Sequence, residues 1–260
     1  VANNGLEISL TGTPIQRENF TWNTRLNYSF NKSVLEKLTT GVNELTFYSA
    51  DENSLRIVAK EGEKLGNIYV YDIAKDEHGN NLISNEGYYV IDKTKYKQVG
   101  NILPKAIGGM TNTFNYKNWA LDFTVDYRFG GKMVSENQKY AMGTGAYENT
   151  LDYRETGITL DGVNQNTGAK NDVHLSGAEY YMNTFAWGAD SWTEKGAVYD
   201  NSFIKMRELS VSYRIPSSVT QKLKLNNVRV SLLGRNLFYF YRTLENIDPE
   251  SPVGNQWWSQ

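Results

Sequence analysis

The segment Leu121-Asp122-Phe123-Thr124-Val125-Asp126-Tyr127-Arg128-Phe129 alternates apolar and polar residues without interruption. Only an extended strand sends successive side chains to opposite faces, so this segment has one apolar face and one charged face. The same alternation occurs in residues 6–11, 22–30 and 208–215. Several long two-faced strands indicate either a large sheet on a soluble core or a barrel with lipid outside and water inside.

The composition excludes some classes of protein but does not decide between a soluble sheet and a membrane barrel. The formal net charge of -2 gives no electrostatic footprint for nucleic acid, and cysteine is absent. No window approaches the ~20 consecutive apolar residues of a membrane-spanning helix, which excludes a helical membrane protein and leaves a barrel open. Aromatic residues make up 13% of the chain, including 18 Tyr. They suit the aromatic girdles of a barrel and the Tyr-rich face of a soluble binding domain equally well.

The order of patterns along the chain predicts six long strands, at residues 6–13, 20–30, 107–116, 119–129, 203–215 and 227–241. Between them, residues 63–71 and 87–91 are predicted as short strands of a hairpin above or inside the barrel. By parity, residues 31–106 contain either no further crossing or two, and we expect none. Residues 130–201 show little periodicity and are predicted as a long loop, which is unusual in a compact soluble domain. Six strands cannot enclose a channel, so we expect the chain to be a fragment of a longer polypeptide.

Several phrases in the second half resemble a known family. Gly100-Asn-Ile-Leu-Pro-Lys105 followed by Gly108-Gly109 is similar to "GNPLPKYTGG", and SFIKMRELSVSY at 202–213 is similar to "SFIKLREVSLSY". VSLLGRNLF at 230–238 is similar to "VSLSGRNLF", and the Asp-Pro-Glu of residues 248–250 follows it as in that family. Their order and spacing over about residues 100–250 resemble the C-terminal barrel region of the SusC/RagA family, the large TonB-dependent outer-membrane transporters of Bacteroidota.

This resemblance implies an all-β fold, the C-terminal part of an antiparallel transmembrane β-barrel of about 22 strands that holds a plug. Residues 1–260 would be barrel wall, with extracellular loops at about 31–106, 130–201 and 242–260, and with the N-terminal plug and remaining strands absent from this chain. The family implies import of oligosaccharide or oligopeptide nutrients. It also implies a location as an integral protein of the bacterial outer membrane.

The resemblance further implies a set of partners. These are a SusD-like surface lipoprotein, outer-membrane lipid, the cargo, and TonB, which would act through the missing N-terminal region. No cofactor, no metal and no nucleic acid is expected.

In a barrel, the two faces of residues 121–129 have separate roles. The lipid-facing side chains would be Leu121, Phe123, Val125, Tyr127 and Phe129. The lumen-facing side chains would be Asp122, Thr124, Asp126 and Arg128. The alternative is a soluble domain in which the apolar face packs on a second sheet.

One aromatic cluster in the predicted loop is a candidate for contact with the substrate or with a lid. Tyr180, Tyr181, Trp187 and Trp192 lie within thirteen residues, and aromatic rings beside polar groups can stack on sugars or clamp a peptide. The alternative is that these rings pack the loop onto its neighbours.

The sequence contains no recognisable catalytic site. His78 and His174 are the only histidines and lie apart in loop regions, with no metal-binding spacing and no nucleophile elbow. We therefore predict a protein that is not an enzyme. Two other functions stay open, a soluble glycan-binding β-sandwich module and a passive outer-membrane porin or adhesin barrel.

Overall fold

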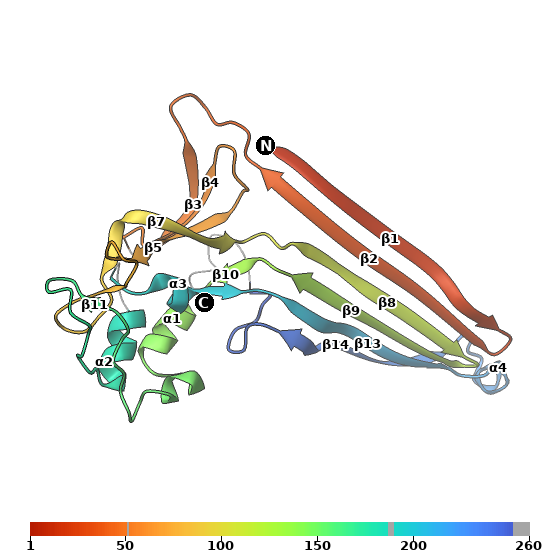
Figure 1. The fold of residues 1–260 in the computed structure, drawn as a ribbon. Coiled ribbons are helices and arrows are strands. Elements are labelled where there is room, and N and C mark those ends of the chain that lie inside the picture. The colour runs from red at the N-terminus through yellow and green to blue at the C-terminus, as the bar shows by residue number, and fades with distance from the viewer. Residues whose placement is uncertain (51, 187–189, 252–260) are drawn as a thin grey trace.

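A computed structural model describes residues 1–50, 52–186 and 190–251. Its largest element is one six-stranded sheet in which every neighbouring pair is antiparallel (Figure 1). In spatial order the strands are β1 (Ala2–Arg17), β2 (Phe20–Val34), β8 (Ala106–Tyr116), β9 (Trp119–Phe129), β13 (Phe203–Arg214) and β14 (Arg229–Arg242). No described strand from residues 35–105 joins this sheet, which confirms the predicted six long strands.

The connections at one end of this sheet are short. Lys117 has a left-handed φ of 52° in the tight turn between β8 and β9. Its N–H donates at 3.0 Å to the carbonyl of Asn19, which lies in the tight turn between β1 and β2. The two turns therefore lie beside each other. A longer connection joins β13 to β14 and contains α4 (Ser217–Thr220) and the 3-10 helix η3 (Gln221–Leu223).

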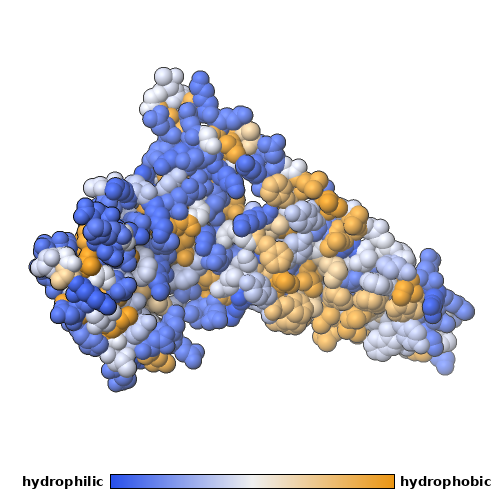
Figure 2. Space-filling view, viewed as in Figure 1, coloured by the Kyte–Doolittle hydropathy of each residue, from blue (hydrophilic) through white to orange (hydrophobic). Residues whose placement is uncertain are grey.

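The two faces of the sheet differ in chemistry. The register places Leu26 beside Met110 and Met110 beside Val125, so apolar side chains of neighbouring strands form rows on one face. This apolar face is exposed, with Leu10 at 59% and Leu232 at 79%, and it appears as the orange band in Figure 2. Nothing in the described residues covers it, which argues against a sheet packed on a second sheet.

The two long excursions between sheet strands, residues 35–105 and 130–202, fold together into one lobe at the opposite end from the tight turns (Figure 1). The first excursion supplies a four-stranded antiparallel sheet of order β3-β4-β5-β7, and the second supplies the helices. No helix of the described residues is long and apolar enough to cross a membrane. The lobe consists of β3 (Glu44–Ala50), β4 (Leu55–Lys60), β5 (Asn67–Ile73), β6 (Leu82–Ile83), β7 (Ile91–Asn101), β10 (Lys132–Val134), α1 (Glu136–Gly143), the 3-10 helix η1 (Glu148–Leu151), β11 (Val163–Asn164), α2 (Gly177–Tyr181), the π-helix η2 (Met182–Ala186), α3 (Thr193–Ala197) and β12 (Val198–Asp200).

The lobe has more regular structure than its sequence predicted. The strand expected at 63–71 begins only at Asn67, because Gly62 and Gly66 adopt left-handed φ angles of 79° and 77° in the preceding turn. The prediction of a strand at 87–91 is wrong, since Gly87 (φ 91°) lies in a turn and β7 begins at Ile91. Residues 130–201, predicted as a loop, contain three α-helices and short strands.

Two hydrophobic cores hold the lobe together. In the first, Leu55, Ile57, Ile68 and Val70 of the four-stranded sheet pack against Val134 and Ala197 from the second excursion. In the second, Ile83 packs against residues 160–185. Each core joins both excursions, so the lobe is one folded unit.

Candidate functional site

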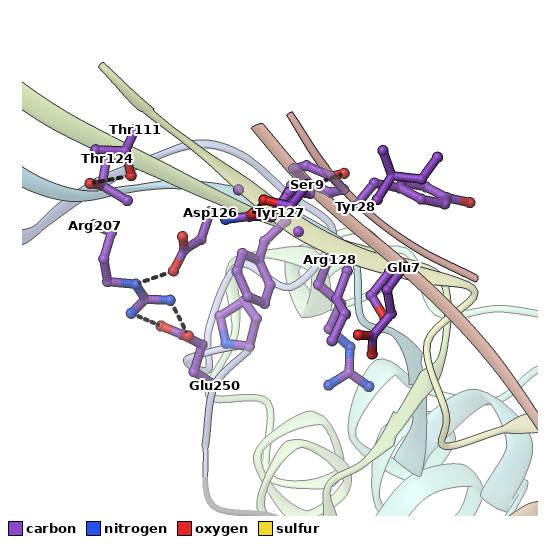
Figure 3. Close-up of a pocket in the computed structure, with 18 of the residues that line it drawn as sticks. Glu7, Ser9, Tyr28, Thr111, Thr124, Asp126, Tyr127, Arg128, Arg207 and Glu250 are labelled. Carbon is purple, nitrogen blue, oxygen red and sulfur yellow. Dashed lines mark hydrogen bonds and ion pairs between the residues drawn. The ribbon is translucent and has the colours of Figure 1, made fainter. Parts of the chain in front are cut away.

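The polar face of the six-stranded sheet lines a hollow of about 1040 Å³. The predicted lumen-facing residues Asp122, Thr124, Asp126 and Arg128 share this face, and the last three line the hollow (Figure 3). Polar groups bond across the strands, since Thr113 Oγ1 donates to Asp122 Oδ1 at 2.7 Å and the Thr111 and Thr124 hydroxyls lie 3.1 Å apart. The face therefore presents a ladder of hydroxyls, amides and charges.

Arg207 is the most connected residue of this face. The register of β13 shifts between Met206 and Glu208, and this β-bulge inserts Arg207 as an extra residue. Its Nε donates to Asp126 Oδ2 at 2.6 Å and its Nη1 to Asn236 Oδ1 at 2.8 Å. Its Nη1 and Nη2 also donate to the two carboxylate oxygens of Glu250, as Figure 3 shows. One guanidinium thus joins three strands and the chain that follows β14.

The chain after β14, residues 243–251, folds back over the polar face, and we call it the return segment. Leu244 is 2% exposed, and Pro249 is fully buried, with its carbonyl accepting from Asn201 Nδ2 at 3.1 Å. Tyr239 Oη donates to Asp248 Oδ1 at 2.6 Å, and Lys205 Nζ pairs with Glu250. Four polar contacts therefore hold the Asp-Pro-Glu turn to β13 and β14, and Asn201, just before β13, adds a fifth.

Both carboxyls of this turn have lowered pKa values. Hydrogen bonds from Arg207 hold the pKa of Glu250 below its ordinary value despite the opposing effect of burial, and Lys205 adds to the lowering. Burial opposes ionisation of Asp248, yet hydrogen bonds from Tyr239 and from the Glu250 N–H leave its pKa lowered. The carboxyls of Asp248 and Glu250 therefore favour the ionised form when the turn is attached to the sheet.

The predicted lipid-facing residues share the apolar face. Leu121, Val125 and Phe129 alternate along β9 with the polar set, and their neighbours across the strands are mostly apolar. Tyr127 lies across Gly108, and its hydroxyl donates to the Asn27 carbonyl at 3.3 Å. Contact of these side chains with lipid stays a prediction.

The described aromatic candidates Tyr180, Tyr181 and Trp192 do not form one surface. Tyr180 and Tyr181 are 5% and 6% exposed and belong to the second core of the lobe, beside Phe185. Tyr181 Oη donates to the Asn149 carbonyl at 3.1 Å. Trp192 is half-buried, with its ring edge-on to Tyr89 at 5.3 Å, and Trp187 lies outside the described residues. This packing favours the alternative in which these rings hold the loop to its neighbours.

Lys205 and Arg207 were not among the predicted site residues, and Asp248 and Glu250 entered the prediction only as part of a family phrase. A signal was present, because the apolar residues of β13 fall at 204, 206, 209 and 211, and the one spacing of three marks the bulge. Within the described residues no group of three or more His, Asp or Glu side chains is placed to hold a metal ion.

Comparison with curated proteins finds relatives along nearly the whole chain. A TonB-dependent receptor P3 of Formosa agariphila is 26% identical over 97% of this chain and 25% of its own length. The TonB-dependent receptor SusC of Bacteroides thetaiotaomicron is 25% identical over 97% of this chain and 24% of its own length. No protein-family profile matches. The chain spans about a quarter of the length of these relatives.

Solved structures agree on the fold. The RagAB peptide importer in its open-open state matches 96% of this chain and 26% of the matched chain, with a TM-score of 0.63 and 18% identity. The closed-closed state gives a TM-score of 0.62 over 92% of this chain. The motif resemblance is therefore confirmed: over nearly its whole length, this chain is similar to a part of TonB-dependent receptors, SusC among them, and it shares the fold of the RagAB importer structures.

Proposed function

We propose that this chain is a C-terminal portion of the barrel wall of a TonB-dependent importer in the bacterial outer membrane. Its relatives are receptors and transporters, and the proposed mechanism is binding and gated passage of cargo without covalent chemistry. The cargo class is oligosaccharide or oligopeptide, in line with a SusC among the relatives and a peptide importer among the structural neighbours.

The observation that carries this proposal is the uncovered two-faced sheet. β8 and β9 have 11 residues each, the length that spans a bilayer at a tilt of ~45°. The apolar face shows no cover within the described residues and carries aromatic residues toward both ends, such as Trp119 and Phe129. Alternating apolar and polar faces with aromatic girdles are typical of outer-membrane barrels, and open strands at β1 and β14 would pair with further strands.

The lobe and the polar face have different roles in this proposal. The polar face with its return segment would line the lumen, beside plug and cargo. The lobe, built from excursions 35–105 and 130–202, would lie outside the cell under a SusD-like lipoprotein. TonB would act through a part of the protein outside this chain.

The two rival functions account for fewer of these observations. A soluble glycan-binding sandwich needs a second sheet over the apolar face, and the described residues provide none. A passive porin or adhesin barrel shares the strands, but the curated relatives are TonB-dependent receptors.

The test uses two neighbouring residues of β9 in the full-length protein. Val125→Arg places a charge on the apolar face near mid-height, which costs ~2–4 kcal/mol at a bilayer midplane. Thr124→Arg, the matched control, places the same charge on the polar face beside Asp126. We expect Val125→Arg to reduce assembly into outer membranes strongly and Thr124→Arg to leave it nearly unchanged, measured by membrane fractionation and urea unfolding. Equal effects of the two substitutions would contradict the barrel.

Native mass spectrometry of the complex, extracted from outer membranes in mild detergent, tests the importer itself. We expect a polypeptide much longer than this chain, a bound lipoprotein, and co-purified peptide or glycan. Recovery from the soluble fraction without a partner would favour the binding module instead.

A further inference from the structure

A cleft opens where β2 separates from β8, and we call it the junction cleft. The two strands pair only as far as Ser29 and Ile107, while β2 continues to Val34 beside β1. There it meets the lobe, where the Leu65 N–H donates to the Ser33 carbonyl at 3.1 Å. The cleft has a volume of about 380 Å³ and lies between the end of β2 and the chain around residues 100–105 and 130–132. It therefore lies at the boundary between the apolar face and the lobe, where hydrophilic atoms replace the orange band in Figure 2.

Four lysines line this cleft: Lys32, Lys64, Lys105 and Lys132. Lys132 Nζ pairs with Asp200 Oδ1 at 2.9 Å, and Asp200 is the one acidic residue in the lining. Within the described part of the chain, the other three lysines make no ion pair.

Neighbouring carboxylates do not neutralise Lys32, Lys64 and Lys105. Glu63 precedes Lys64, but its carboxylate accepts from Asn67 Nδ2 at 2.9 Å and from Tyr69 Oη at 2.6 Å. The hydrogen bond from Tyr69 is the main cause of the lowered pKa of Glu63. The cleft therefore holds an excess of three positive charges, and like charges that converge are unfavourable without an anion.

Glycines let two of the lysine stems lie against the backbone. A Cβ at Gly130 (φ 70°) would be 2.8 Å from Lys105 Cγ, and a Cβ at Gly100 would be 2.5 Å from Lys132 Cγ. The alkyl stems thus cover the glycine backbone while the ammonium groups stay accessible, as expected for lysines at an interface. Side chains at these glycines would push the lysines away from the cleft.

The rim of the cleft is apolar. Phe30 and Leu103 line it and are 39% and 38% exposed, and Phe129, at 42%, ends the adjacent strand of the apolar face. Cationic groups directly above an exposed apolar surface match the two halves of a membrane lipid, an anionic headgroup above acyl chains. A soluble anion would need the charges but would gain nothing from the apolar rim.

We propose that the junction cleft binds the phosphorylated headgroup of an outer-leaflet lipid, with the acyl chains along the apolar face below Phe30. This inference rests on the proposed outer-membrane orientation of the sheet. Lys32, Lys64 and Lys105 supply charge-assisted hydrogen bonds to phosphate oxygens, and Lys132 stays paired with Asp200. The bound lipid fills the gap between β2 and β8 and ties the sheet to the lobe.

The experiment uses the full-length complex in detergent, with diphosphoryl lipid A and inorganic phosphate as the two probes, followed by native mass spectrometry. The variant is K32Q/K64Q/K105Q, and the matched control is K95Q/K170Q/K222Q, which removes three exposed lysines away from the cleft. At roughly 1 kcal/mol per lysine, we expect lipid A binding to weaken on the order of 100-fold in the variant and to stay unchanged in the control. Excess inorganic phosphate should not displace the lipid from the wild-type protein.

Two results would overturn the inference. One is unchanged lipid binding in the cleft variant, and the other is displacement of the lipid by excess inorganic phosphate in the wild-type protein, which would indicate a site for a soluble anion. The second measurement needs no variant, so a variant that fails to fold leaves the inference testable. Membrane fractionation of the wild-type protein separates the two proposals, because absence from the outer membrane contradicts the proposed function and not only the lipid site.

Discussion

At the scale of single residues, Glu250 controls the attachment of the return segment to the wall. Its pKa is lowered in the folded protein, mainly by hydrogen bonds from Arg207. A lowered folded-state pKa contributes stability above the ordinary carboxyl pKa of about 4.3, and this stability is lost as pH falls through the folded value. We therefore expect the return segment to be attached at neutral pH and to loosen progressively as acid protonates Glu250.

A spin label at Ser251→Cys measures this prediction, because the chain has no native cysteine. Glu250→Gln should make the label mobile already at pH 7, since it removes the carboxylate that ties the segment to Arg207 and Lys205. Glu245→Gln, a change at an exposed carboxylate of the same segment, is the control and should behave as the wild-type protein. A label that stays immobile in Glu250→Gln at neutral pH would show that Pro249 and Leu244 alone hold the segment.

At the scale of elements, the pairing of β2 with β8 depends on a residue without a side chain. A Cβ at Gly108 would lie 2.2 Å from the Asn27 carbonyl oxygen and 2.5 Å from Tyr127 Oη. Gly12, on β1, has nothing within 4 Å of the same position. We expect Gly108→Ala to destabilise the sheet by about 1–3 kcal/mol and Gly12→Ala to have almost no effect, measured as the urea midpoint of unfolding in micelles. A similar loss of stability at both glycines would mean that strand propensity, and not the close approach of β2 to β8, determines the effect of the substitution.

The long strands could be predicted because their chemistry is local. Residues 121–129 alternate so regularly that the bounds of β9 follow from the sequence. β7 was missed because Asp92-Lys-Thr-Lys-Tyr-Lys-Gln98 is polar on both faces, and its pairing with β5 is what makes it a strand. The attachment of Glu250 to Arg207 joins residues 43 positions apart, which no local pattern encodes.

At the scale of the whole molecule, the lobe should respond as one unit although its two excursions are far apart in the sequence. Ile57 of β4 is fully buried against Val134 and Ala197. The Ser54 and Thr193 hydroxyls lie 3.3 Å apart, and Lys97 Nζ is 2.9 Å from Glu194 Oε2. These contacts join the four-stranded sheet to α3, so a defect in the sheet should reach the helix.

We expect Ile57→Ala to destabilise the lobe by ~2–5 kcal/mol, because it leaves a cavity in the first core. Hydrogen exchange, measured by mass spectrometry on the full-length protein, should then accelerate together in residues 55–73 and 193–200. Leu45→Ala is the matched control, since this β3 side chain is 48% exposed and contributes little to the core. The six-stranded sheet should keep its protection in both variants, because its strands are joined by their own ladder of backbone hydrogen bonds. Acceleration confined to residues 55–73 would show that the two excursions fold independently, and the lobe would then be two loops in contact.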